Sequence, residues 1–327
     1  MRTQDALSAR RAVHIEASRP NVPNEGGRYD RRHMDSASDF SRDGYCVLPA
    51  AFSPDEVALM REDADFILQL ILGSSIANER QSRRLDIRRR KSGGIVVRKI
   101  QPVLDLAPAF AEFAGDERLL GPLAELMEDE PVLFEEKLNY KQPLPDAIAT
   151  APEMRLFQTP ADDDRFPVHN DYAYYRYNDY PPEVVSTAIA IDDCRADNGP
   201  MLVFPGTHTS HVEHLRVRNG LEVPEGTVNR AEAVPVVAPA GSILFFHSRL
   251  IHTSGPNPTS EPRRLLIFSH FPKAAAIPFD IRNGPNRLRE SPWEWRYQRM
   301  KNAGYQDAIC LSGVPQKTKL PSASEEP

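Results

Sequence analysis

The sequence predicts a mainly β protein in which helices pack on a β-sandwich or a jelly roll. From about residue 131 the chain consists of short runs rich in Val, Ile, Leu and Phe, separated by turn signals such as "DNGP", "FPGT" and "APAGS". The 30 prolines are scattered along the chain and argue against a helical bundle. Helical patterns come before the strands, and this order favours helices packed on antiparallel sheets.

The composition is that of a globular protein with a substantial core. Of the 327 residues, 40% are hydrophobic and 26% are charged, which is ordinary for a soluble domain. The net charge of −6 favours neither nucleic acid nor a membrane as a partner. No apolar run approaches the roughly 20 residues of a membrane-spanning helix. Cys46, Cys194 and Cys310 are widely spaced and predict no disulfide scaffold. Without a secretory signal, we expect a cytoplasmic monomer or homodimer.

The N-terminal third predicts an arm followed by a strand and a helix. Residues 1–37 are polar and lack any period, so we expect a disordered arm. The run "DGYCVLPAAF" predicts a short strand. The run "SPDEVALMREDADFILQLI" predicts an amphipathic helix, with Ser53 as N-cap, Pro54 at the first helical position and Glu56 completing a capping box.

A basic run separates this helix from the next one. The second helical region is expected over residues 107–129, and the run "RQSRRLDIRRRKSGG" covers residues 80–94. A solvated loop is the favoured interpretation of this run. The alternative is that it contacts an anionic group of a substrate or carrier.

The remainder predicts the β core and a C-terminal extension. Strands are expected within residues 131–142, 166–172, 183–194, 199–208, 233–248 and 263–271. A helix is expected over residues 291–305 and a flexible tail over 313–327. A single domain would then span residues 38–312, with the jelly-roll core at about 131–272.

The residues that carry chemistry lie in two distant blocks. In "FPVHNDY", His169 and Asp171 would project from the same face of an extended strand. His252 follows Asp171 by 81 positions, and Arg263 follows His252 by eleven. Two imidazoles and one carboxylate on one face of a metal leave the other face open, which is the ligand set of non-heme Fe(II) oxygenases. A zinc hydrolase with the same ligands and a non-catalytic jelly-roll binding protein are the rival hypotheses.

Four ordered blocks resemble a known family. These are "DGYCVLPAAFSPDEV", "HND", "AIAIDDCRADNGPMLVFPGTHTSH" and "AGSILFFHSRLIHTSGPNPTSEPR". From about residue 38 to 272 the chain resembles the phytanoyl-CoA dioxygenase family of Fe(II)/2-oxoglutarate-dependent oxygenases, which also includes ectoine hydroxylase. The resemblance implies a double-stranded β-helix, a cupin-like jelly roll, that uses Fe(II), 2-oxoglutarate and O2. It implies hydroxylation of an unactivated C–H bond of a small-molecule metabolite or natural-product intermediate, with release of succinate and CO2.

The same resemblance implies roles for individual residues. His169, Asp171 and His252 match the iron ligands. Arg263 matches the arginine that pairs with the C5 carboxylate of 2-oxoglutarate, and its neighbour Arg264 is a less favoured alternative by spacing. Two further residues match positions that help to bind 2-oxoglutarate in relatives: Ser254 and Asn139.

Departures from the family bear on the substrate and the reaction. Ala188 stands where the phytanoyl-CoA hydroxylases have a tryptophan, which favours a small substrate and leaves an acyl-CoA hydroxylase as the alternative. Ser242 replaces an acidic residue at a turn, with little bearing on the chemistry. Halogenating relatives lack the carboxylate ligand, so Asp171 disfavours halogenation.

Other polar and aromatic residues have two interpretations each. Tyr172 and Tyr174 are expected either to pack at the edge of the sandwich or to line a substrate pocket, and these two are the better pocket candidates of a tyrosine-rich run. Three histidines admit a second metal, but turn capping or exposure is favoured for them: His208, His211 and His214. The loop after Asp171 and the segment around Trp293 and Trp295 are candidate lids.

Overall fold

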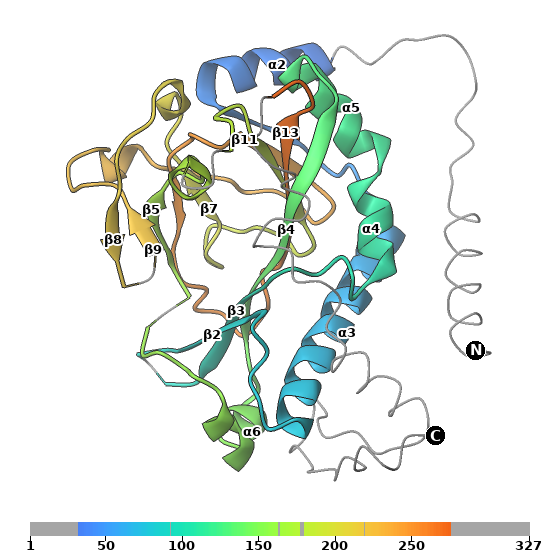
Figure 1. Ribbon diagram of the computed structural model, residues 1–327, viewed down its shortest axis with the longest axis vertical. Coiled ribbons are helices and arrows are strands. Elements are labelled where there is room, and N and C mark those ends of the chain that lie inside the picture. Colours follow the sequence, from blue (N-terminus) through green and yellow to red (C-terminus); the bar gives the residue numbers. More distant parts are fainter. Residues whose placement is uncertain (1–31, 92, 163, 177–179, 219, 276–327) are drawn as a thin grey trace. The chain divides into compact units, whose positions relative to one another are not determined.

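The computed structural model describes residues 32–275, apart from residues 92, 163, 177–179 and 219. Its β-structure consists of two antiparallel sheets and a separate hairpin (Figure 1). The seven-stranded sheet has the order β1 (Tyr45–Leu48), β11 (Ile243–His247), β6 (Val185–Ala190), β13 (Leu265–Pro272), β4 (Pro131–Pro143), β3 (Ile95–Ile100) and β2 (Leu85–Arg89). The four-stranded sheet has the order β10 (Val234–Pro235), β7 (Met201–Val203), β12 (His252–Ser254) and β5 (Phe166–His169). The hairpin pairs β8 (Leu215–Val217) with β9 (Gly220–Glu222). The predicted mainly β jelly-roll class is confirmed.

The helices α3, α4 and α5 lie along one side of the large sheet (Figure 1). The α-helices are α2 (Arg32–Asp43), α3 (Pro54–Ala77), α4 (Pro108–Ala114), α5 (Glu117–Met127), α6 (Asp146–Ala149) and α7 (Tyr172–Tyr175). Helix α3 begins as predicted, because Ser53 accepts a hydrogen bond from the Glu56 amide and the Glu56 side chain accepts one from the Ser53 amide. Tyr140 on β4 donates a hydrogen bond to the Ala64 carbonyl of α3 at 2.6 Å, which ties helix and sheet together.

The large sheet separates two apolar clusters, and its strands alternate between them. On β13, Leu266 and Phe268 pack in the cluster shared with the helices, whereas Leu265 and Ile267 pack in the cluster shared with the small sheet. Successive side chains of a strand point to opposite faces, so a sheet covered on both faces is apolar at nearly every position. The second cluster lies beside the cavity described below.

Two local features differ from what the sequence led us to expect. Helix α2 begins at Arg32, so residues 32–37, which were assigned to a disordered arm, are helical; the helix brings Phe40 into the core. The basic run of residues 80–94 is not simply a loop, because its centre forms strand β2. Within that strand Leu85 and Ile87 are buried and alternate with polar residues. The charges of the run obscured this period-two pattern.

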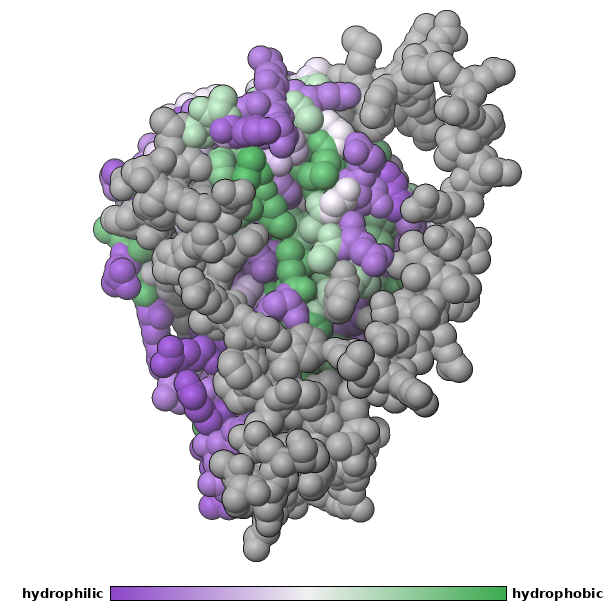
Figure 2. Space-filling view, turned by 45° about the vertical axis from the view of Figure 1, so that its right-hand side comes forward, coloured by the Kyte–Doolittle hydropathy of each residue, from purple (hydrophilic) through white to green (hydrophobic). Residues whose placement is uncertain are grey.

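Several predictions fall on residues outside the described ones, namely the remainder of the arm, the helix at 291–305, the tail at 313–327, Cys310, Trp293 and Trp295. Cys46 and Cys194 are buried free thiols. On the side of the molecule that carries the helices, the described surface mixes hydrophilic and hydrophobic residues (Figure 2). Among residues 32–275 as described, no helix is both long and apolar enough to cross a membrane.

Candidate active site

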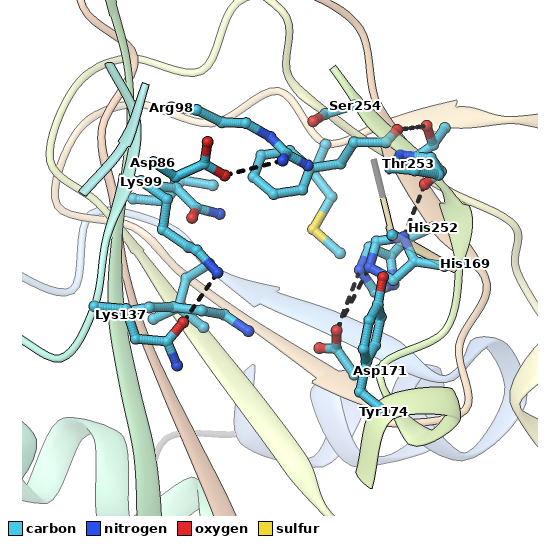
Figure 3. A pocket seen from close by; sticks show the side chains of 18 of the residues that line it. Asp86, Arg98, Lys99, Lys137, His169, Asp171, Tyr174, His252, Thr253 and Ser254 are labelled. Atoms are coloured by element: carbon cyan, nitrogen blue, oxygen red, sulfur yellow. Dashed lines mark hydrogen bonds and ion pairs between the residues drawn. The ribbon is translucent and has the colours of Figure 1, made fainter. Parts of the chain in front are cut away.

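A cavity of about 490 Å³ lies between the two sheets. Its lining includes residues of β2, β3 and β4 on one side and residues of β5 and β12 on the other (Figure 3). This volume is within the usual range for a small-molecule site. Three of the predicted site residues, His169, Asp171 and His252, line it together.

Sheet register brings the two histidines together. Strands β5 and β12 are antiparallel neighbours, and His252 is the direct partner of His169. Directly opposed residues on one face of an antiparallel pair have neighbouring side chains. The two imidazole rings accordingly lie with their centroids 4.4 Å apart.

Asp171 joins them by a route that differs from the predicted one. Strand β5 ends at His169, and Asp171 has helical dihedral angles of −67° and −30° at the start of α7. The chain therefore turns after His169, and the carboxylate folds back toward the histidines. Its Oδ1 atom lies 3.6 Å from Nε2 of His169 and 3.9 Å from Nε2 of His252. One ligand atom from each of the three side chains lies within 4.8 Å of the other two.

The hydrogen bonds of both histidines direct Nε2 toward the cavity. Nδ1 of His169 donates to the Pro167 carbonyl at 2.8 Å, and Nδ1 of His252 donates to the Leu250 carbonyl at 2.9 Å. A carbonyl can only accept, so Nδ1 carries the proton and Nε2 of a neutral ring keeps its lone pair. Burial and the neighbouring His169 lower the pKa of His252 to about 4, so its ring is neutral at pH 7.

The carboxylate of Asp171 is ionised although it is buried. Burial opposes its ionisation, but the nearby charge of Lys137, with His169 and His252 beside the carboxylate, outweighs burial and holds the pKa of Asp171 well below its usual range. Two neutral imidazole nitrogens and one carboxylate oxygen form a donor set that suits Fe(II) and leaves coordination positions open. The residues present therefore fit the ferrous ion that the sequence motif implies.

Arg263 is a buried arginine at the cavity with hydrogen-bond donors left unused. Arg263 lines the cavity, is only 1% exposed, and donates one hydrogen bond, from Nη2 to the Gly199 carbonyl at 2.8 Å. Its Nε and Nη1 atoms have no acceptor among the described residues. A buried guanidinium with two unused donors calls for an anionic partner, since unsatisfied buried donors are costly. The C5 carboxylate of 2-oxoglutarate fits this requirement.

The other predicted site residues divide between the cavity and the core. Ser254, Asn139 and Tyr174 line the cavity. Tyr174 packs edge-on against His169, and its hydroxyl accepts a hydrogen bond from the Leu221 amide at 2.8 Å, which joins the site to the β8–β9 hairpin.

Tyr172 and Ala188 are not among the residues that line the cavity, and their roles at the substrate stay predictions. Tyr172 packs against His211 instead. Ala188 lines a separate apolar void of about 20 Å³ within the core.

His211 and His214 have polar partners of their own. Among the described residues, the triad is the one group of His, Cys, Asp and Glu side chains close enough to share a metal. His214 donates from Nδ1 to the Val212 carbonyl and accepts at Nε2 from the Asn170 amide. His211 contacts Arg176 at 2.8 Å.

One wall of the cavity is charged and is formed by Asp86, Arg88, Arg98, Lys99, Glu135 and Lys137. Only the basic run that contains Asp86 and Arg88 had been considered for contact with an anion, and then as the less favoured alternative. One signal was available for Asp86 and Arg88, since they alternate with the buried Leu85 and Ile87 of β2. The motifs shared with the family cover none of these positions.

Comparison with known proteins agrees with the geometry. A sequence model described as phytanoyl-CoA dioxygenase (PhyH) matches residues 40–265. The chain is similar to the ectoine dioxygenase of Nocardia farcinica, with 26% identity over 292 residues that cover 83% of this chain and 87% of the relative. It is also similar to the L-proline trans-4-hydroxylase of Streptomyces griseoviridis, with 22% identity over 259 residues that cover 72% of this chain and 85% of the relative.

Solved structures show the same fold. EctD from S. alaskensis with 2-oxoglutarate and 5-hydroxyectoine aligns with a TM-score of 0.53 and 24% identity, covering 77% of this chain and 80% of that one. AviO1 from Streptomyces viridochromogenes aligns with a TM-score of 0.54 and 21% identity, covering 77% of this chain and 99% of AviO1.

Proposed function

The chain belongs to the phytanoyl-CoA dioxygenase (PhyH) family and is an Fe(II)/2-oxoglutarate-dependent dioxygenase. We propose that it hydroxylates an unactivated C–H bond of a small-molecule metabolite or natural-product intermediate. The observation that carries the proposal is the mutual proximity of His169, Asp171 and His252 on a cavity that also contains the unsatisfied guanidinium of Arg263. The relatives named as ectoine dioxygenase and L-proline hydroxylase support a small substrate.

In the proposed assignment each residue has a defined task. The ferrous ion is held by Nε2 of His169, a carboxylate oxygen of Asp171 and Nε2 of His252. Arg263 binds the C5 carboxylate of 2-oxoglutarate, and Ser254 and Asn139 assist from the lining. When bound, iron with 2-oxoglutarate and O2 supplies the oxidising power that hydroxylates the substrate and releases succinate and CO2.

The protein contributes orientation and shielding. The Nδ1 hydrogen bonds of both histidines fix their rings before metal binding, which lowers the cost of ordering the ligands. Tyr174 and the β9 residue Gly220 line the cavity, and a Cβ added to Gly220 would lie 2.5 Å from the Tyr174 hydroxyl. The hairpin is thus held close to the cavity, where it restricts the access of water.

The test is simultaneous measurement of O2 uptake and succinate release after Fe(II), 2-oxoglutarate and each of a panel of small candidate substrates are added to metal-free protein. We expect both, in equal amounts, and neither when Zn(II) replaces Fe(II). A non-catalytic binding protein would consume no O2, and a zinc hydrolase would be activated by Zn(II) instead.

A cytoplasmic location, a monomeric or dimeric state and the domain limits 38–312 stay predictions from the sequence.

A further inference from the structure

The wall of the cavity that faces the metal-ligand triad carries a surplus of positive charge. Figure 3 shows Asp86, Lys99 and Lys137 across the cavity from His169, Asp171 and His252. Within the described lining, this wall contributes four cationic side chains and two carboxylates. The cationic side chains are Arg88, Arg98, Lys99 and Lys137, and the carboxylates are Asp86 and Glu135.

Each carboxylate is shared between two of the cations. Asp86 lies 2.9 Å from Arg88 and 3.0 Å from Arg98. Glu135 lies 3.0 Å from the Lys137 ammonium and is linked through Gln101 to Lys99 by hydrogen bonds of 3.1 and 3.0 Å.

Both lysines of the wall carry charge at pH 7. Burial and the nearby Lys137 lower the pKa of Lys99 only to about 8. Burial opposes the charge of Lys137, but Glu135 and other neighbours outweigh burial and raise its pKa well above the usual range. The wall therefore keeps a surplus of two positive charges.

Loading the centre leaves this surplus in place. The charges of Fe(II) and Arg263 balance those of Asp171 and dianionic 2-oxoglutarate. Because the loaded centre is neutral, the two excess charges of the opposite wall have no partner within the lining. In a partly buried site such charges attract an anion strongly, since they are poorly screened by water.

A β-bulge directs Arg98 into this wall. As β2 advances from Asp86 to Ile87, its partner on β3 moves from Lys99 to Val97, so that Arg98 is an extra residue in the β3 strand. Neighbours on a regular strand face opposite sides, whereas a bulge re-aims one of them. Arg98 and Lys99 both line the cavity for this reason.

The guanidinium of Arg98 is held ready for a ligand. Arg98 is 5% exposed, and its guanidinium carbon lies 3.9 Å from the centroid of the Phe166 ring. Asp86 occupies only Nη1, at 3.0 Å, and Nε has no acceptor among the described residues. Stacking and one ion pair fix the plane of the guanidinium, which suits it to bind two oxygens of one anion.

We propose that the primary substrate is a small anion, and that Arg98, supported by Arg88, binds its carboxylate or phosphate oxygens on the wall facing the metal ligands. This inference rests on the proposed function, because the charge count assumes Fe(II) and 2-oxoglutarate in the cavity. The cavity of about 490 Å³ also has to hold 2-oxoglutarate, so the substrate is small. A neutral substrate would leave the surplus charge of the wall uncompensated.

The test is calorimetric titration of the protein under anaerobic conditions with Fe(II) and saturating 2-oxoglutarate. Saturating 2-oxoglutarate keeps Arg263 occupied, so that a second anion cannot bind there. The probes are acetate, methyl phosphate and the neutral acetamide. We expect saturable binding of acetate or of methyl phosphate, and no binding of acetamide. Which of the two anions binds shows whether the wall takes a carboxylate or a phosphate.

Three variants locate the binding. Arg98→Met should weaken binding of the anion roughly tenfold or more, and Arg98→Lys should restore part of it. Arg89→Met is the matched control, because Arg89 is an exposed arginine of β2, the strand next to that of Arg98, and lies outside the cavity lining. It removes the same charge and should leave the binding of the anion unchanged.

The outcomes separate this inference from the proposed function. The inference would be overturned, and the dioxygenase assignment left intact, if the loaded protein bound neither anion. The same conclusion would follow if the Arg98→Met variant bound the anion as tightly as the wild type does. A protein that does not load with Fe(II) and 2-oxoglutarate would overturn the proposed function, and the inference with it.

Discussion

The consecutive residues Arg263 and Arg264 direct their guanidinium groups to different environments. Arg263 faces the cavity with two donors unused. Arg264 is bound by Asp192, at 2.8 Å from Nε, and by Asp65, at 2.8 Å from Nη1. Only Arg263 is therefore available to a cosubstrate, and the neighbouring arginine provides an internal control for it.

Arg263→Ala should weaken 2-oxoglutarate binding roughly tenfold to hundredfold, because the C5 carboxylate would lose charge-assisted hydrogen bonds in a buried site. Arg264→Ala should reduce stability instead, since Asp192 and Asp65 would lose their shared partner. Titration of both variants with 2-oxoglutarate and thermal unfolding checks this division. Equal affinity for 2-oxoglutarate in wild type and Arg263→Ala would refute the assignment.

His252→Ala and Asp171→Ala should each lose turnover and bind iron more weakly, because each change removes one of three ligands and no other described His, Cys, Asp or Glu lies close enough to replace it. His211→Ala should retain iron, since His211 contacts Arg176 and lies outside the triad. Metal analysis after anaerobic loading with Fe(II) measures this directly. Full iron occupancy in Asp171→Ala would argue against a carboxylate ligand.

Ala188→Trp should lower the free energy of unfolding by about 3 kcal/mol or more, without a change in substrate preference of the folded protein. The reason is overpacking, since Ala188 faces Leu244 and Ile267 across the neighbouring strands beside a void of about 20 Å³. Denaturant unfolding together with a substrate screen checks the prediction. A stable variant with an altered substrate range would show that position 188 does reach the substrate.

His270 should make the protein less stable in acid. Burial lowers the pKa of His270 to about 3 from an ordinary value of 6.5. As the pH falls below 6.5, the unfolded chain takes up a proton that the folded protein cannot, so stability declines between these two values. The loss from this residue at pH 5 is about 2 kcal/mol.

His270→Leu removes this titration and should flatten the dependence of unfolding free energy on pH between pH 6.5 and 5. Part of the slope should persist, because burial also lowers the pKa values of His247 and His252 to about 4. Denaturant unfolding at several pH values gives the comparison. Identical slopes in wild type and variant would mean that His270 takes up its proton in the folded state.

The local patterns of the sequence were sufficient for the fold class, whereas the candidate ligands were proposed from the family motifs. The capping box at Ser53 and the apolar runs of the strands are short-range signals, and both elements form as predicted. The pairing of His252 with His169 depends on strands far apart in the chain. Only the ordered family motifs could indicate it, because periodicity carries no information on which strands become neighbours.

The errors have physical causes. Asp171 reaches the site through a helical turn rather than along a strand, a difference that spacing alone cannot reveal. The charges of Arg88 and Arg98 resemble those of a solvated surface, yet both residues line a cavity because β2 and β3 form one of its walls. The substrate role of Ala188 stays a prediction by analogy, because the direction of a β6 side chain depends on the packing of the two sheets, which the sequence does not show.

The most direct test of the central claim is the visible absorption spectrum of the Fe(II)-loaded protein during anaerobic addition of 2-oxoglutarate. If His169, Asp171 and His252 hold the iron beside Arg263, a metal-to-ligand charge-transfer band appears in the wild type and is absent from His252→Ala. If the wild type binds Fe(II) and 2-oxoglutarate but develops no such band, the iron and the cosubstrate do not share this centre and the account is wrong.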